Sequence, residues 1–147
     1  MGHEAVIYGW IEGATWKTGE RYRRLQSRNE NVLSQLPEKD EWPWLVRGIF
    51  ALPAPWPQGT YRCQAIHLAL TLKDSPCENQ WRDEWIGKFE DVLRRLYWFS
   101  ATLHIIRELD PMQTYRWEAT FESMSGLGSD PPEPTTKWTR TVATDGA

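Results

Sequence analysis

Apolar residues return with a helical period in one long stretch of the chain. From Trp81 to Leu96 they recur at steps of four, four, three and four residues, which places them on one face of a helix. Ser75 precedes the stretch as an N-cap, with Pro76 in the first turn and Glu78 as the partner of a capping box. We predict a helix that starts near Ser75 and lies with this aromatic face on a sheet. Its opposite, exposed face carries the charge pairs Glu84–Lys88, Glu90–Arg94 and Asp91–Arg95.

Shorter stretches have the pattern of β-strands, with apolar residues in unbroken runs or in alternation. They are residues 5–13, 45–52, 60–73, 101–109 and 115–121. The first has apolar side chains on both faces, which indicates an interior strand. The last alternates apolar and charged residues, with Phe121 pointing inward, which indicates a strand with one wet face at or near a sheet edge.

A second helix is predicted over residues 18–36, with Thr18 as its N-cap and Pro37 as its end. Its apolar stripe is narrower than that of the first helix, and its outer face is basic. The basic residues are Arg21, Arg24 and Arg28.

The predicted order is therefore βα-ββ-αβ with one further strand. We expect an α+β fold, a two-layer sandwich in which two helices cover one face of a mostly antiparallel sheet. The βαββαβ order predicts a ferredoxin-like core, and the extra strand joins as a hairpin. This single domain spans residues 1–124, and residues 125–147 form a tail rich in Pro, Ser, Gly and Thr. Only Trp138 could anchor that tail by folding back.

Composition narrows the classes of function. A net charge of −3 over 147 residues argues against nonspecific nucleic-acid binding, which requires a positive field. No apolar segment reaches membrane-spanning length, and no signal segment opens the chain, so we expect a cytoplasmic protein. Cys63 and Cys77 are expected to be free thiols in that reducing compartment. The ten tryptophans suit both a core and a protein interface.

Candidate catalytic residues are few. His67 shares a strand face with Cys63, and His104 lies on another strand, so a Cys/His metal site requires those strands to be neighbours. Glu118 and Glu122 are too far apart along a strand to share a proton. No phosphate-binding loop, hydrolase or kinase motif is present. We expect a protein without metal, cofactor or enzymatic activity; an enzyme using His67 or His104 is the weakest hypothesis.

The candidates for partner binding lie in loops and on the second helix. They are the acidic residues Glu38, Asp40 and Glu41, the loop tryptophans Trp42, Trp44 and Trp56, and the basic residues Arg21, Arg24 and Arg28. Each group has two interpretations. The charged face is either solvated or a contact for an acidic partner, and each tryptophan either packs under its own loop or is an exposed anchor.

Several phrases of the sequence are similar to a known group of proteins. They are VIYGWIEG, LPEKDEWPWLVRGIFALP, TYRCQAIHLALTLKD, WIGKFEDVLRRLYWFSATLHIIREL and YRWEA. Over about residues 5–120 the chain resembles small bacterial immunity proteins, which are found beside polymorphic toxins of the Rhs and contact-dependent kind. The resemblance carries no catalytic motif and implies a cytoplasmic antidote that binds one cognate toxin domain and occludes it. The alternative is a non-enzymatic scaffold or regulatory module of a larger assembly.

Overall fold

The computed structural model describes residues 3–13, 20–52, 65–74, 80–108 and 110–145, without the side chains of residues 3, 20–22 and 74. In chain order the elements are β1 (His3–Gly13), α1 (Glu20–Ser34), the 3-10 turn η1 (Arg47–Ile49), β2 (Phe50–Ala51), β3 (Ala65–Asp74), α2 (Gln80–Leu93), β4 (Trp98–Arg107), β5 (Gln113–Ala119), α3 (Phe121–Leu127) and β6 (Trp138–Thr144). No helix among the described residues is both long enough and apolar enough to cross a membrane.

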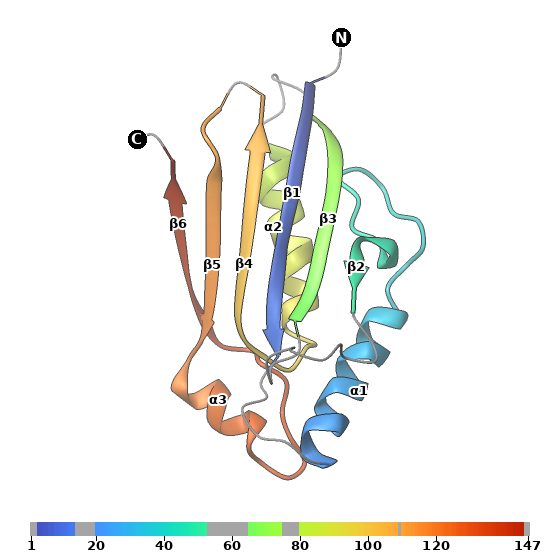
Figure 1. The fold of residues 1–147 in the computed structure, drawn as a ribbon, viewed down its shortest axis with the longest axis vertical. Helices are drawn as coiled ribbons and strands as arrows, with labels where there is room; N and C mark the ends of the chain where they lie inside the picture. Colours follow the sequence, from blue (N-terminus) through green and yellow to red (C-terminus); the bar gives the residue numbers. More distant parts are fainter. Residues whose placement is uncertain (1–2, 14–19, 53–64, 75–79, 109, 146–147) are drawn as a thin grey trace, which may run out of the picture.

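The strands form one open, six-stranded antiparallel sheet in the order β2-β3-β1-β4-β5-β6 (Figure 1). β1 lies inside the sheet, with β3 on one side and β4 on the other. The predicted α+β class and the interior position of the strand at residues 5–13 are therefore confirmed.

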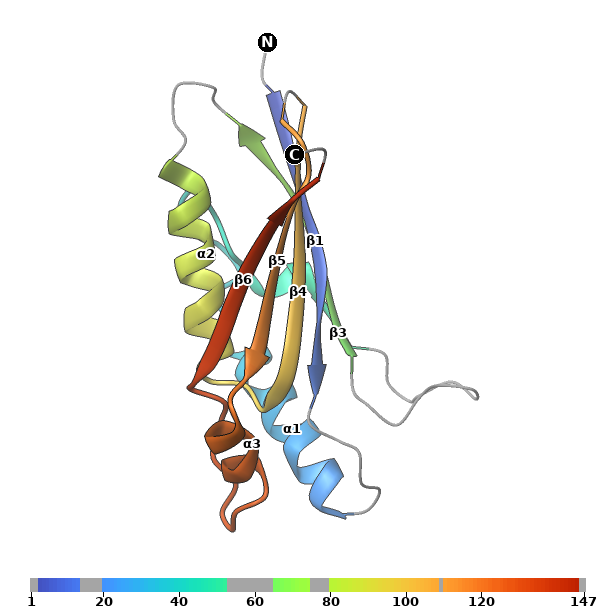
Figure 2. The same ribbon diagram turned by 90° about the vertical axis from the view of Figure 1, so that its left-hand side faces the viewer.

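Helix α2 lies along one face of the sheet and covers the main core (Figure 2). Its predicted apolar face is buried, and Phe89 has its ring 5.6 Å from that of Trp85 and 5.1 Å from that of Trp117 on β5. Alternate residues of β1, among them Ile7 and Ile11, supply the sheet side of this core. The predicted N-terminal cap at residues 75–78 lies outside the described residues.

The other helices do not share that face, so the prediction of two helices on one face is wrong. Figures 1 and 2 show α1 and α3 at the lower end of the sheet, while α2 alone runs along its face. Only the C-terminal end of α1 reaches the main core, through Val32 and Leu33, and Leu36 joins the core just after the helix. Leu25, more than two turns earlier, packs instead with Tyr97 and Leu127 in a second cluster.

A buried amide explains the position of α1. The side chain of Asn29 donates from Nδ2 to the carbonyl of Tyr97 (3.0 Å) and accepts at Oδ1 from the Tyr97 N–H (2.7 Å). Asn29 is 1% exposed, so this pair of bonds replaces water for both partners. The middle of α1 is thereby tied to the chain that leads into β4, below the sheet.

The strand predicted at residues 45–52 is mostly absent, since only β2 pairs with the sheet. The Arg47 N–H donates to the Pro37 carbonyl (2.9 Å) and the Ile49 N–H to the Val46 carbonyl (3.3 Å), which folds the segment into a turn. Leu45 and Ile49 are then buried at a four-residue spacing. A short apolar run is compatible with either conformation, and here contacts outside the run select the turn.

Helix α2 also ends earlier than its apolar pattern, and β4 begins at Trp98 rather than at residue 101. The N–H groups of Arg95 and Leu96 bind carbonyls three residues back, which tightens the last turn. The indole Nε1 of Trp98 also donates to the Leu93 carbonyl (2.8 Å), which thus accepts two hydrogen bonds at the helix end.

The strand predicted at residues 115–121 has the expected length and lies near the sheet edge as expected, but it starts and ends two residues earlier. β6 pairs along its outer side, and β5 ends at Ala119. Thr120 caps α3, with its hydroxyl accepting from the Ser123 N–H (3.4 Å). Phe121 then lies in the first turn of α3 and is 87% exposed instead of pointing inward.

The segment after residue 124 differs most from the expected tail. β6 extends the sheet, and its Trp138 ring lies 5.8 Å from Trp98 and under the guanidinium of Arg94 (5.1 Å). Thr135 is fully buried: its hydroxyl donates to the Trp98 carbonyl (2.6 Å) and accepts from the Trp98 N–H (3.2 Å). Backbone and hydroxyl bonds hold this segment together with the packing of Trp138, and the amino-acid composition does not reveal these bonds.

Candidate protein-binding site

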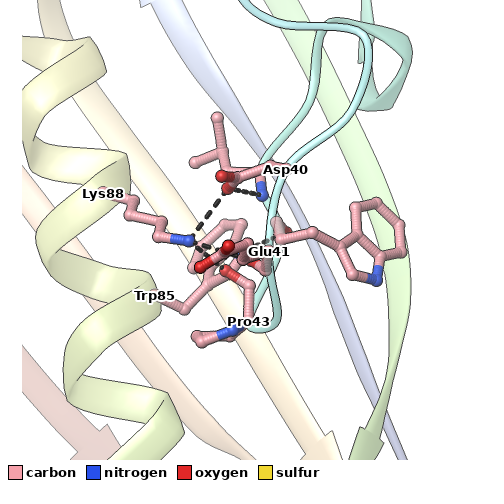
Figure 3. Close-up of polar contacts among 7 residues, drawn as sticks. Asp40, Glu41, Pro43, Trp85 and Lys88 are labelled. Atoms are coloured by element: carbon pink, nitrogen blue, oxygen red, sulfur yellow. Dashed lines mark hydrogen bonds and ion pairs between the residues drawn. The ribbon is translucent and has the colours of Figure 1, made fainter.

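Residues 37–46, which we call the acidic loop, connect α1 to η1 and pass alongside α2 (Figure 3). Lys88 of α2 holds this loop. Its Nζ donates to Oδ2 of Asp40 (2.8 Å) and to the carbonyl oxygens of Glu41 (3.1 Å) and Pro43 (2.8 Å). A single cation thus fixes a side chain and two backbone groups of the loop.

Further bonds close the same contact. The Leu45 N–H donates to Oδ2 of Asp40 (3.0 Å), and Trp85 of α2 donates from Nε1 to the Trp44 carbonyl (3.0 Å). The hydrogen bond from Lys88, followed by that from Leu45, holds the pKa of Asp40 below its ordinary value. The Asp40 carboxylate is therefore charged and is directed at the protein's own groups.

The two tryptophans of the acidic loop have different environments. Trp44 is half-buried and packs against the main core, as expected of a residue under its own loop. Trp42 is 40% exposed, while its Nε1 donates to the Lys73 carbonyl of β3 (3.2 Å). The Trp42 ring is thus fixed at one end and accessible to a partner. The third candidate, Trp56, lies outside the described residues.

The other two acidic candidates are exposed. Glu38 forms an ion pair with Arg47 at 2.7 Å, in which both side chains remain accessible to water. The Glu41 carboxylate forms no ion pair with the part of the chain that the structure describes. Glu41 and Trp42 are therefore the adjacent groups of the acidic loop that are most available for binding.

The basic candidates lie on α1, which is at the lower end of the sheet, apart from the acidic loop. Arg24 is exposed. Arg28 has its guanidinium 5.8 Å from the ring of Tyr97 and donates from Nη1 to the Tyr97 hydroxyl (3.4 Å). The side chain of Arg21 is outside the described residues. Arg28 therefore has a structural contact, whereas Arg24 faces solvent.

The helix pairs predicted by spacing are partly replaced by longer-range contacts. Lys88, paired with Glu84 by the pattern, binds the acidic loop instead. Glu90, paired with Arg94 by the pattern, accepts from Nε1 of Trp117 (2.8 Å). In both cases the partner is on another element: Lys88 donates to oxygen atoms of the acidic loop, and Glu90 accepts from the buried Trp117 of β5.

A group of rings lies on the face of the sheet opposite α2. His104 has its ring 4.9 Å from Tyr8 and 5.8 Å from Trp10, and its Nδ1 lies 2.8 Å from the Thr114 hydroxyl. We call Tyr8, Trp10 and His104 the aromatic cluster. Tyr8 is 37% exposed, so the cluster is a second surface at which a partner could bind. Alternation along the strand at residues 5–13 was the signal that could have identified it.

The two strand histidines are not on neighbouring strands. β1 lies between β3 and β4, and His67 is opposite Trp10, while His104 is opposite Tyr8. Cys63, the other member of the imagined metal site, lies outside the described residues. Within the described ranges, no three His, Cys, Asp or Glu side chains are close enough to hold a metal ion.

The paired glutamates are also separated. Glu118 on β5 binds Arg116 at 3.0 Å, whereas Glu122 is in α3 and binds Lys137 at 2.8 Å. Each carboxylate is in an exposed ion pair of its own rather than facing the other.

The described geometry is that of an α+β protein with an open antiparallel sheet, a fixed acidic loop and an exposed aromatic cluster. Comparisons of the chain with protein-family models, with curated proteins and with solved structures found no match.

Proposed function

We propose that this chain is an immunity protein, which binds a cognate secreted bacterial toxin domain and neutralises it by stoichiometric occlusion. The resemblance of residues 5–120 to such proteins motivates the proposal. The observation that carries it further is the acidic loop, because Lys88 holds it in one conformation with Glu41 and Trp42 outward.

A loop that is ordered before binding loses less conformational entropy when the complex forms. Trp42 offers a large amphipathic ring whose orientation is fixed by its bond to Lys73. Such rings are common energetic anchors of interfaces. Glu38 and Glu41 add negative charge beside it, which favours a basic surface of the kind that toxins acting on nucleic acids or nucleotides need in order to bind their substrates.

The contacts also divide the candidate residues by role. Asp40 and Trp44 serve the loop itself, since the first binds Lys88 and the second packs on the core. Glu41 and Trp42 are the residues proposed to touch the toxin. If the toxin surface is acidic, Arg24 is the residue proposed to touch it.

The proposal is tested by co-purifying the chain with the product of the adjacent toxin gene and titrating the toxin's activity. Activity should vanish near one equivalent and return on dissociation, with a Kd of about 1 nM or below, because antidotes act at low copy number. Glu41→Lys and Trp42→Ala should each weaken binding at least about tenfold. Glu30→Lys is the matched charge reversal, on exposed α1, and should leave the affinity unchanged.

Two results would contradict this proposal in different ways. Neutralisation by far less than one equivalent would indicate enzymatic modification of the toxin rather than occlusion. Unchanged affinity of the Glu41→Lys, Trp42→Ala and Arg24→Glu variants would show that neither the acidic loop nor α1 contacts the toxin. The aromatic cluster would then be the next candidate surface. Co-purification with a multi-protein assembly and no toxin would favour the scaffold or regulatory module.

We further propose that β1 to β4 with α1 and α2 correspond to a ferredoxin-like core. The order β2-β3-β1-β4 supports this, since β3 separates β1 from β2 and β1 separates β3 from β4, as in two interleaved βαβ units. The position of α1 below the sheet is a departure from a helix layer on one face. A crystal structure with another strand order for β1 to β4 would contradict this correspondence.

A further inference from the structure

β6 is the outermost strand on one side of the sheet and is open to solvent. From Thr139 to Thr144 every side chain is exposed, and only Trp138 at its start is half-buried. Its pairing with β5 is continuous from end to end. The strand is therefore well held on its inner side, and in the described part of the chain no strand pairs with its outer side.

The direction of its backbone groups follows from two hydrogen bonds at its ends. The Thr120 N–H donates to the Lys137 carbonyl (3.1 Å), and the Asp145 N–H donates to the Met112 carbonyl (2.9 Å), both in the register of the β5–β6 pair. Bonded residues alternate along an antiparallel pair, so the odd-numbered residues of β6 face β5. The residues whose N–H and C=O groups point outward are Trp138, Arg140, Val142 and Thr144.

This edge has few of the features that usually prevent strands from associating, and Arg140 is its one charged residue. Residues 138–144 include no proline, no lysine and no glycine, and the pairing shows no bulge. They are mostly threonine, valine and tryptophan, which favour extended structure. The opposite edge of the sheet, β2, consists of only two residues, which is itself a protection.

One exposed apolar side chain, that of Val142, lies on this edge, and another, that of Phe121, lies in α3 beyond the start of β6. Phe121 is 87% exposed and Val142 is 49% exposed, the two highest values among the large exposed hydrophobic residues of the described chain. Phe121 follows Thr120, which is bonded to Lys137 at the start of β6. Val142 therefore adds one exposed apolar side chain to an unpaired strand, which a second strand would cover.

We propose that β6 pairs antiparallel with β6 of a second copy of this chain, so that the two sheets become one. In the register that places Trp138 opposite Thr144 of the second copy, the outward-facing residues of both copies bond to each other. Arg140 is then opposite Val142 of the second copy, so that no two arginines face each other directly. The two-fold axis passes at Thr141, as expected of an isologous dimer.

The charges beyond the strand ends fit the same register. Lys137 precedes β6 and Asp145 follows it, and both are exposed; Lys137 is also in an exposed ion pair with Glu122 of its own chain (2.8 Å), so it would contact both carboxylates or exchange one for the other. The pairing places Lys137 opposite Asp145 of the second copy, and the symmetry repeats this contact at the other end. A strand of an unrelated partner could also bind this edge, but the match of opposite charges at both ends is a property of the chain with itself.

The test measures the mass of the full-length chain by sedimentation velocity from about 1 μM to about 1 mM, because an interface of one strand pair is small and its dimer weak. We expect a reversible monomer–dimer equilibrium. Val142→Pro removes an outward N–H while leaving the bonds to β5, and it should weaken the dimer at least tenfold. Val142→Thr keeps that N–H and should dimerise like the unaltered chain.

A second set of variants avoids the strand itself. Asp145→Lys places two lysines together and should weaken the dimer, and adding Lys137→Glu should restore it. A chain that is monomeric over the whole range, or a dimer unaffected by Val142→Pro, would overturn the proposal. If Val142→Pro weakens the dimer but the charge variants do not change it, the proposed register is wrong. Thermal unfolding of the monomers confirms that each variant is folded. None of these readouts depends on a toxin.

Discussion

Gly9 is the position at which a single atom matters most. A Cβ atom there would lie 2.0 Å from the Thr102 carbonyl oxygen and 2.9 Å from the side chain of Leu103, both on β4. β4 is held between β1 and β5, so its backbone cannot withdraw without loss of sheet hydrogen bonds. The close approach of two central strands therefore requires glycine at residue 9.

We expect Gly9→Ala to lower the free energy of unfolding by about 3 kcal/mol or more, since the new methyl group meets backbone rather than a flexible side chain. Urea unfolding measures the loss. Gly87→Ala is the control: it is exposed within α2, its Cβ would meet nothing within 4 Å, and it should stabilise the chain by about 0.5–1 kcal/mol. A Gly9→Ala variant as stable as the original chain would contradict the close approach.

Asp40 predicts a pH dependence. Its pKa is lowered in the folded protein by the hydrogen bond from Lys88, so the contact stabilises the fold above the ordinary value of 3.8 and is lost as the pH falls through the lower, folded value. Asp40→Asn should therefore be less stable than the original chain at pH 7, and the difference should shrink below about pH 4. Urea unfolding across that range measures it, and a pH-independent difference would contradict the assignment.

At the scale of elements, α2 depends on its aromatic face. Trp85 is fully buried, its ring stacks on Phe89, and its Nε1 binds the acidic loop. Trp85→Ala should lower the free energy of unfolding by about 3–5 kcal/mol through the cavity it leaves. Glu84→Ala, at the adjacent exposed position, should change it by about 0.5 kcal/mol at most. A loss below about 1 kcal/mol for Trp85→Ala in urea would show that this face is not the core contact.

The C-terminal segment depends on Thr135. Thr135→Val keeps the shape of the side chain but leaves the backbone N–H and C=O of Trp98 without this hydroxyl partner, so we expect a loss of about 1–3 kcal/mol. The same change at exposed Thr136 should have little effect. Equal thermal stability of the two variants would mean that the hydroxyl of residue 135 does not hold the segment.

Helical and strand periods predicted what lies against the core. The face of α2 and the interior position of β1 are visible in the sequence, because their apolar residues are numerous and regularly spaced. β6 is not visible in the sequence, because most of its side chains face water. Its extended conformation depends on hydrogen bonds to β5 rather than on an apolar pattern. The strand prediction for residues 45–52 was wrong for a related reason. The conformation of this segment depends on the hydrogen bond from the Arg47 N–H to the Pro37 carbonyl, which lies outside the segment.

The candidate site was predicted in the same uneven way. Its residue types are evident from the sequence, and the acidic loop does present Glu41 and Trp42 outward. The sequence does not distinguish Asp40, which is bound to Lys88, from Glu41, which is not. That distinction depends on a lysine 48 residues away along the chain, for which i,i+4 spacing offered a nearer but wrong partner.

At the scale of the whole molecule, the two faces of the sheet differ. α2 and the acidic loop cover one face, whereas the opposite face carries the aromatic cluster and, in the described residues, no helix. The proposed contacts are thus distributed: the acidic loop beside α2 for a toxin, and β6 at the edge for a second copy. A dimer formed through β6 leaves the acidic loop of each copy accessible, since β2 and β6 are opposite edges of the sheet.

The central place of β1 has a consequence for the speed of folding. β1 pairs His3 with Asp74 and Ala5 with Arg107, so the earliest strand of the chain waits for segments that are distant along the sequence. Chains dominated by such non-local pairings fold in milliseconds to seconds. A long loop must close, at a cost in entropy, before the strands gain any stabilising contact. Before β3 and β4 pair with it, β1 is a β-prone segment with six apolar residues in eleven and both edges unpaired, and such segments aggregate. The yield of refolding should therefore fall as the protein concentration rises, even under conditions in which the native state is stable.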